Sequence, residues 1–400
     1  MRSAEGTERL HHLDALRAST MLLLVPVHAA SLLSANGHEG AWAVAIYWTV
    51  HVFRLPLFFS MSGFFLALLV SKRGVRQTAR NRTLRIALPL GAGLLVLIPL
   101  MVAAGQQTGV IVASDGKPST GSPFALQPSF LWFLWYLLIL DGVAMATWLC
   151  APGLLRRAGT AIGAGLAQPF PGLVLLAIPT TIALWPQFSW TAATESTTFV
   201  PSLSILAYYA LFFGLGATLC AHRYLLAAAA RNAWRWLGFA VAATLPAALL
   251  FTLHNSPTYG SSPVVHGAAL LIYALATWAS LLALIGLATR YLNRPKPRLR
   301  YLADASYWIY LSHMPLMVPV LALLAATSLG LPLQFAIVTA SALALSLLTY
   351  ALCVRYSVIG RVLNGPRRRP ERSRSRSQAG FDLLGRSRFT RSEEAAEPQA

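Results

Sequence analysis

Apolar residues are grouped along the chain into runs of about twenty, which is the length a helix needs to cross the roughly 30 Å hydrocarbon core of a bilayer. Short polar segments separate the runs. The pattern predicts an all-α, polytopic integral membrane protein. Its ten transmembrane helices are expected at 14–34, 46–70, 85–104, 130–150, 170–187, 201–221, 236–253, 264–289, 302–325 and 333–355.

Composition and charge agree with this interpretation. Of the 400 residues, 56% are hydrophobic and 11% are charged, whereas a soluble domain carries about 25% charged residues. If both termini lie in the cytoplasm, all but Arg54 and Lys117 of the 32 basic residues fall on the cytoplasmic side, as the positive-inside rule requires. The net charge of +19 then faces the anionic lipid bilayer, and we expect no nucleic-acid partner.

The chain divides into two regions by composition. Residues 1–360 form the predicted membrane domain, and residues 361–400 are rich in Arg and Ser. Such a low-complexity, highly charged segment cannot bury enough apolar surface to fold, so we predict a disordered cytoplasmic tail.

The first predicted helix carries three ionisable residues. Asp14 and Arg17 are three residues apart and share a helix face. His28 follows Arg17 by eleven residues and returns to that face about 16 Å deeper in the bilayer. Ionisable groups in hydrocarbon are costly unless they are paired or face a wet cavity, so this face is expected to line a site. The alternative is that His28 donates to a neighbouring helix for packing.

Basic residues on the next two helices extend the candidate site. Arg54 lies at a depth similar to that of His28, unless its long stem carries the charge to the outer interface. Arg82 and Arg85 share a face at the cytoplasmic rim, with Arg80 nearby. Two guanidinium groups at this spacing can bind phosphate bidentately, but arginines here also satisfy the positive-inside rule. Spacing alone leaves both interpretations open.

The fourth and ninth helices supply further candidates. Ser306, Tyr310 and His313 follow a helical stripe, and His313 lies close to the depth of His28; it is either a second imidazole of the site or a structural donor. Trp132 and Trp135 suit the outer end of a helix, and Asp141 is a candidate partner for a buried arginine or histidine. We group Ser306, Tyr310, Trp132, Trp135 and Asp141 as candidate substrate contacts. No metal-ligand spacing occurs, so no metal is predicted.

Five stretches, taken together, resemble the acyltransferase type 3 family of integral membrane O-acyltransferases. They are LDALRASTMLLLVPVH (13–28), LPLFFSMSGFF (55–65), KRGVRQTARNRTLRIALPL (72–90), LWFLWYLL (131–138) and RYLADASYWIYLSHMPL (300–316). Within the family they are most similar to the branch that succinylates periplasmic glucans. The resemblance implies about ten helices, a cytoplasmic acyl donor and an extracytoplasmic acceptor. The long Arg/Ser tail and the absence of a fused esterase-like domain depart from the family pattern.

The resemblance also assigns residues. The family's essential histidine falls on His28, its preceding arginine on Arg17, and its Arg-x-x-Arg element on Arg82 and Arg85, which favours phosphate binding there. The expected co-substrate is acyl-CoA, with no bound cofactor. Its phosphates would bind Arg82 and Arg85, helped by Arg80.

The expected chemistry follows from these roles. Neutral His28, paired on its helix face with Arg17 and Asp14 and joined by His313, would act as general base on a glycan hydroxyl. Arg54 would stabilise the oxyanion or grip a succinyl carboxylate; acetyl is the other candidate acyl group. Direct transfer and a covalent acyl-histidine both remain open.

The expected location is the bacterial cytoplasmic (inner) membrane. A transporter or flippase for a glycan or an acylated solute is the alternative function, using the same buried charges as a relay.

Overall fold

The computed structural model describes residues 10–37, 41–110, 127–167, 169–187, 198–254, 262–294 and 296–365, and every regular element within these ranges is a helix. In chain order they are α1 (His11–Leu22), α2 (Leu24–Ala35), α3 (Ala41–Arg82), η1 (Thr83–Ala87), α4 (Leu88–Ala92), η2 (Gly93–Leu97), α5 (Ile98–Thr108), η3 (Ser129–Leu131), α6 (Trp132–Cys150), α7 (Pro152–Ala167), α8 (Pro169–Leu184), α9 (Leu203–Ala221), α10 (Tyr224–Arg231), α11 (Ala233–His254), α12 (Pro263–Tyr291), α13 (Pro297–Ala325), α14 (Leu331–Thr349), η4 (Tyr350–Val354) and α15 (Val358–Asn364).

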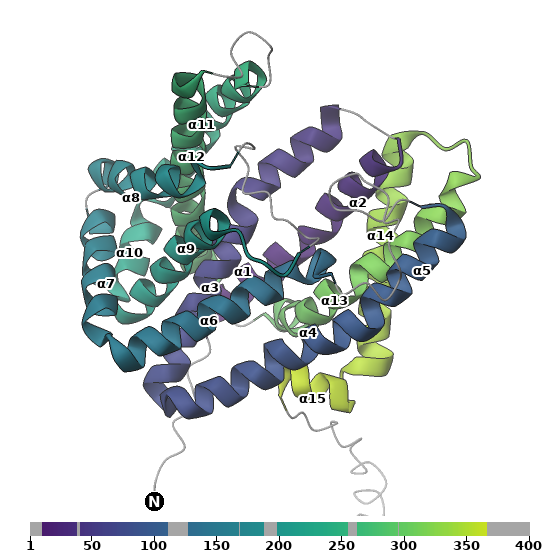
Figure 1. Ribbon diagram of the computed structural model, residues 1–400, viewed down its shortest axis with the longest axis horizontal. Helices are drawn as coiled ribbons and strands as arrows, with labels where there is room; N and C mark the ends of the chain where they lie inside the picture. Colours follow the sequence, from purple (N-terminus) through teal and green to yellow (C-terminus); the bar gives the residue numbers. More distant parts are fainter. Residues whose placement is uncertain are drawn as a thin grey trace, which may run out of the picture.

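Seven helical stretches in the described ranges are long and apolar enough to cross a membrane. They are His11–Ala35, Thr49–Thr108, Ser129–Cys150, Leu203–Ala221, Pro263–Tyr291, Pro297–Ala325 and Leu331–Val354. The stretch Thr49–Thr108 contains Gly74, whose φ of 76° breaks the helix, and the chain reverses there before continuing into α4 and α5 (Figure 1). The prediction of an all-α polytopic membrane protein is confirmed. The count of ten and the cytoplasmic placement of both termini stay predictions.

Three short helices lie where the hydrophobic pattern gave none. The amphipathic α7 and α10 occupy segments expected to be cytoplasmic loops, and α15 runs through the expected boundary between residues 360 and 361. All three carry too few consecutive apolar residues to register as spans. The predicted disordered tail lies outside the described residues from 366 onward.

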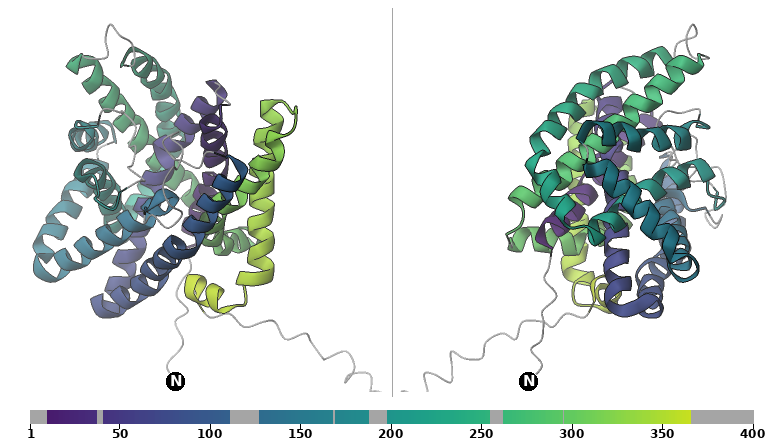
Figure 2. Two further views of the ribbon diagram at one scale, coloured as in Figure 1. Left: turned by 45° about the vertical axis from the view of Figure 1, so that its right-hand side comes forward. Right: turned by 90° about the vertical axis from the view of Figure 1, so that its left-hand side faces the viewer.

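The helices at the centre of the bundle bring distant parts of the sequence together. Helix α1 packs against α13, α12 and α3, while α11 and α12 run side by side on one flank and α14 on the other (Figures 1 and 2). Helices α3 and α9 approach closely because Gly63 and Gly216 have no side chain. A Cβ at Gly63 would overlap the backbone of Phe213, and a Cβ at Gly216 would overlap the backbone of Ser60. Small residues allow such close contact between helices in membranes.

Candidate active site

A small cavity lies where α1, α2, α3, η3, α6 and α13 meet. Its walls are mostly apolar and aromatic, with two ionisable side chains among them. The lining residues are Thr20, Met21, Leu24, His28, Arg54, Leu55, Phe58, Phe130, Trp132, Phe133 and Tyr310. Apolar walls that hold a few polar groups are typical of small-molecule sites.

His28 reaches this cavity from α2. Leu23 interrupts the helix between α1 and α2, three residues before Pro26, which supplies no backbone N–H to the helix. His28 is partly exposed to the cavity, and its ring meets that of His313 edge-on, with ring centroids 5.1 Å apart and an interplanar angle of 65°. The two imidazoles predicted from matching depths therefore do come together.

His313 lies behind His28 and not on the cavity surface. Its side chain is fully buried, and Nδ1 lies 2.7 Å from the carbonyl oxygen of Tyr310 on its own helix, α13. A carbonyl only accepts, so Nδ1 carries the proton. Nε2 then has no proton to donate, and it has no hydrogen-bond partner among the described residues. In this arrangement His313 can orient the ring of His28, while His313 itself does not meet a substrate in the cavity.

Arg54 places a buried positive charge in the cavity wall. It is 4% exposed, and it interacts electrostatically with His28. One turn earlier on α3, the buried His51 lies within electrostatic range of His28 as well. His51 is not among the residues predicted for the site, although its spacing of three residues from Arg54 places both on one helix face.

Three arginines gather around Arg85. Arg85, in the π-helical turn η1, interacts electrostatically with Arg17, Arg73 and Arg82. We call these four residues the arginine cluster. Three guanidinium groups within electrostatic range of a fourth make a region that favours a polyanion, and guanidinium groups suit phosphate oxygens. Arg80 is exposed at the end of α3.

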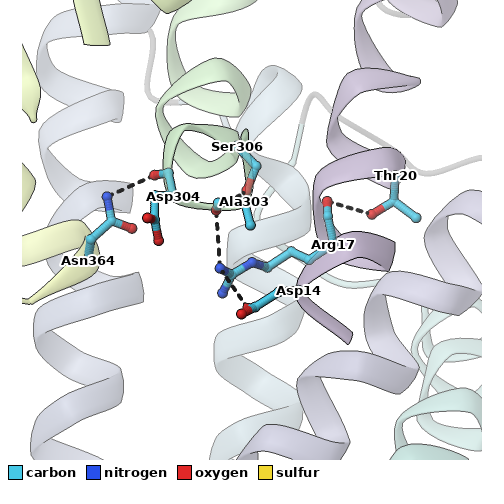
Figure 3. A network of polar contacts seen from close by, with 7 residues as sticks. All are labelled: Asp14, Arg17, Thr20, Ala303, Asp304, Ser306 and Asn364. Carbon is cyan, nitrogen blue, oxygen red and sulfur yellow. Dashed lines mark hydrogen bonds and ion pairs between the residues drawn. The ribbon is translucent and has the colours of Figure 1, made fainter. Parts of the chain in front are cut away.

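Arg17 is held between two helices. Its Nη2 lies 3.4 Å from Oδ1 of Asp14 and donates to the carbonyl oxygen of Ala303 over 3.1 Å (Figure 3). The same carbonyl accepts from the hydroxyl of Ser306, so Ser306 belongs to this network. Ser306 does not line the cavity, and its contact with a substrate stays a prediction.

Two tyrosines of α13 connect the cavity to the arginine cluster. The Tyr310 ring lines the cavity, and its hydroxyl donates to the carbonyl oxygen of Phe130 over 3.1 Å. Tyr307, one turn earlier, donates to the carbonyl oxygen of Arg85 over 2.6 Å, and the two tyrosine rings lie 6.4 Å apart. On α1, Thr20 lines the cavity one turn above Arg17. Two cavity-lining residues, Thr20 and Tyr310, thus lie one helical turn from Arg17 and from the Tyr307 that bonds to Arg85.

Of the remaining predicted substrate contacts, one lines the cavity and two do not. Trp132 lines the cavity, but the indole nitrogen of Trp135 donates to the carbonyl oxygen of Phe199 over 2.9 Å. Residues three apart lie only about 60° apart around a helix, so spacing does not separate these two tryptophans; the contact of Trp135 with Phe199 does. Asp141 does not line the cavity either: its carboxylate is fully buried, and Oδ2 lies 3.4 Å from Nε of Arg82.

A family model described as an acyltransferase domain matches residues 10–351 of the chain. The chain belongs to the type 3 acyltransferase family. It is therefore a membrane-embedded acyltransferase, in agreement with its apolar helices.

Curated relatives support this assignment. The chain is 26% identical over 347 residues to proteins named glucans biosynthesis protein C from Salmonella schwarzengrund and Salmonella typhi, covering 78% of this chain and 84% of each relative. The protein of the same name from Salmonella gallinarum is 25% identical over 345 residues, with the same coverage of both chains. No solved structure matches.

Proposed function

We propose that this membrane acyltransferase transfers a short acyl group from acyl-CoA, bound on the cytoplasmic side, to a hydroxyl of an extracytoplasmic glycan. The single observation that carries the proposal is the position of His28. It lines a cavity beside Arg54, and Thr20 of the same cavity lies one helical turn from Arg17 of the arginine cluster. A base, a buried cation and an anion-binding region along one line are the parts this reaction needs.

The donor would bind with its phosphates on the arginine cluster. Coenzyme A carries phosphate groups at one end and the thioester at the other. Arg85 and Arg82 would hold the phosphates, helped by Arg17, Arg73 and the exposed Arg80. The pantetheine arm would then follow α1 past Thr20 to His28, the face that lines the cavity. The turn at Gly74, next to the cluster in sequence, would face the cytoplasm of a bacterium, and the membrane would be its inner membrane.

His28 would act as the general base. Its imidazole removes the proton from the acceptor hydroxyl as the oxygen attacks the thioester carbon. The carbonyl oxygen then becomes an oxyanion, which Arg54 can stabilise across the cavity. When the C–S bond breaks, the thiolate of coenzyme A takes the proton from His28. The base is restored, and the acceptor carries the acyl ester.

The cavity supports a short acyl group. Its wall combines apolar side chains with the cation of Arg54. Acetyl and succinyl both fit this chemistry, and succinyl would also pair its carboxylate with Arg54. The acceptor class is taken from the name of the relatives, which refers to glucans.

The deciding experiment measures mass. Glycans exported by cells that carry or lack the gene are compared by mass spectrometry, and purified protein is supplied with acetyl-CoA or succinyl-CoA and a glucan. Addition of an acyl mass, in cells and in the purified system, supports the enzyme. A transporter or flippase would change the location of the glycan and leave its mass unaltered.

A further inference from the structure

Asp141 is a buried carboxylate that the reaction outlined above does not use. It lies on α6 with none of its side chain exposed, and neither carboxylate oxygen has a hydrogen-bond partner within the described ranges. Its one charge contact there is Arg82, with Oδ2 3.4 Å from Nε. Burying an anion is expensive, and a nearby cation must offset the cost. Arg82 is therefore the cation that offsets the cost of burying Asp141.

Arg82 is gripped from two helices. Its side chain is 13% exposed, with Nε facing Asp141 of α6 and Nη2 donating to the carbonyl oxygen of Ser62 on α3 over 3.3 Å. The two contacts come from different elements and leave Nη1 unused. A guanidinium is planar, so fixing two of its nitrogens fixes the direction of the third.

Repulsion within the arginine cluster would displace Arg82 if these two contacts did not hold it. Arg82 and Arg85 lie on neighbouring turns and repel each other, as do Arg17 and Arg73 with Arg85. Arginine has a long, mobile stem, and like charges would drive Arg82 away from the cluster when no anion is bound. A fixed carboxylate on the far side of Nε holds the guanidinium in place before the ligand arrives. Groups held in advance do not lose conformational entropy on binding.

We propose that Asp141 is a positioning residue for the acyl donor: it holds Arg82 ready for a phosphate of acyl-CoA and does not touch the donor itself. This inference rests on the proposed function, in which the arginine cluster binds the donor. The competing role is a structural one, in which the pair only fastens α6 to α3. The two roles differ in what happens to donor affinity in protein that is correctly folded.

The test uses the full-length protein in detergent with acetyl-CoA or succinyl-CoA as donor, and coenzyme A alone for equilibrium binding. Asp141→Asn keeps the shape of the side chain and removes its charge. We expect KM for the donor and Kd for coenzyme A to rise about fivefold to twentyfold, with kcat within about twofold, since lost preorganisation acts on binding. Thr147→Val removes a hydroxyl that bonds only within α6 and serves as the matched control on the same helix.

A double-mutant cycle distinguishes positioning of Arg82 for the donor from a purely structural role in holding α6 against α3. Arg82→Gln should weaken donor binding, and adding Asp141→Asn to it should change KM by less than about twofold, because the carboxylate then has no guanidinium to position. Effects that multiply would overturn the proposal. So would an unchanged KM and Kd in folded Asp141→Asn.

Folding is controlled separately. Because Asp141→Asn leaves a buried arginine without its counter-charge, that variant can fail to fold. Asp141→Glu keeps the charge and displaces it by one methylene, and it should raise KM while the protein remains monodisperse. Wild-type KM in Asp141→Glu together with failure of Asp141→Asn to fold would show that the pair only fastens the helices. If the wild-type protein transfers no acyl group from either donor, the proposed function itself fails, which is a different outcome from each of these.

Discussion

The imidazole of His28 meets the edge of the His313 ring across the interface between α2 and α13, with centroids 5.1 Å apart. Only His28 of the two lines the cavity, and His313 is fully buried with Nδ1 tied to its own helix. We propose that His28 meets the substrate and that His313 orients the ring of His28. The first two predictions separate these roles.

Replacing His28 should remove the base and leave the fold intact. We expect His28→Ala to lower kcat by about 10²- to 10⁴-fold, the range that general-base catalysis contributes. The measurement is acyl transfer from acetyl-CoA or succinyl-CoA, alongside membrane insertion and gel-filtration behaviour. His222→Ala, which changes a histidine between α9 and α10, is the control. Full activity in His28→Ala would end the general-base assignment.

Replacing His313 should reveal a positioning role. His313→Phe keeps an aromatic edge against His28 and should retain kcat within about threefold, because most of the packing survives. His313→Ala empties the space behind the ring, and we expect kcat to fall about tenfold or more, with KM little changed, as the base loses its orientation. Equal losses in both variants would indicate that the imidazole of His313 contributes more than packing.

Arg54 should discriminate between donors if it grips a carboxylate. A hydrogen bond to a charged group contributes about 1.5–3 kcal/mol, which corresponds to roughly tenfold to 100-fold in affinity. Arg54→Gln should therefore lower kcat/KM for succinyl-CoA by about that factor more than for acetyl-CoA. Steady-state kinetics with both donors decide the matter. Equal losses for the two donors would mean that Arg54 acts only on the oxyanion common to both reactions.

The arginine cluster should govern donor affinity in a salt-dependent way. Arg85→Ala removes the guanidinium that interacts with the other three members, and we expect KM for acyl-CoA to rise about tenfold with kcat nearly unchanged. Added salt should weaken donor binding to the wild type more than to this variant, because fewer charges remain to be screened. Arg157→Ala, at an exposed position on α7, is the control. An unchanged KM in Arg85→Ala would leave topology as the role of this residue.

Close packing between α3 and α9 predicts a steep response to one added carbon. A Cβ at Gly216 would overlap the backbone of Ser60, so we expect Gly216→Ala to destabilise the protein by about 1–3 kcal/mol through overpacking. Gly142→Ala on α6 is the matched control, since a Cβ there meets nothing within 4 Å. Thermal unfolding in detergent should show a lower Tm for the first variant only. Similar Tm values in both would mean that α3 and α9 can separate at no cost.

The hydrophobic pattern predicted the class of fold well because each membrane crossing is a local property. Twenty apolar residues in a row indicate a span whatever their neighbours do. The same reasoning failed for α7, α10 and α15, whose residues are too mixed to signal a span. The helical period placed Asp14 and Arg17 together, and they form an ion pair on α1. His28 lies on α2, beyond the interruption at Leu23, so its sharing of that face stays a prediction.

The candidate site was predicted in part. Trp132 and Tyr310 line the cavity, while Trp135, Ser306 and Asp141 lie elsewhere. Depth along a helix can be read from residue number, but the direction in which a side chain points across the bundle depends on how each helix is rotated against its neighbours. That rotation is set by packing between segments far apart in the sequence.

The sequence alone determined that this chain is helical and crosses a membrane several times. That its basic residues gather at one side, and that Asp14, Arg17 and His28 share one helix face, stay predictions. Only the tertiary structure decided that His28 meets His313, that Arg54 lies in the same cavity, and that Asp141 pairs with Arg82. The physical reason is that hydrophobicity and helical period are local, whereas a buried ionisable group finds its partner on whichever helix packing brings beside it.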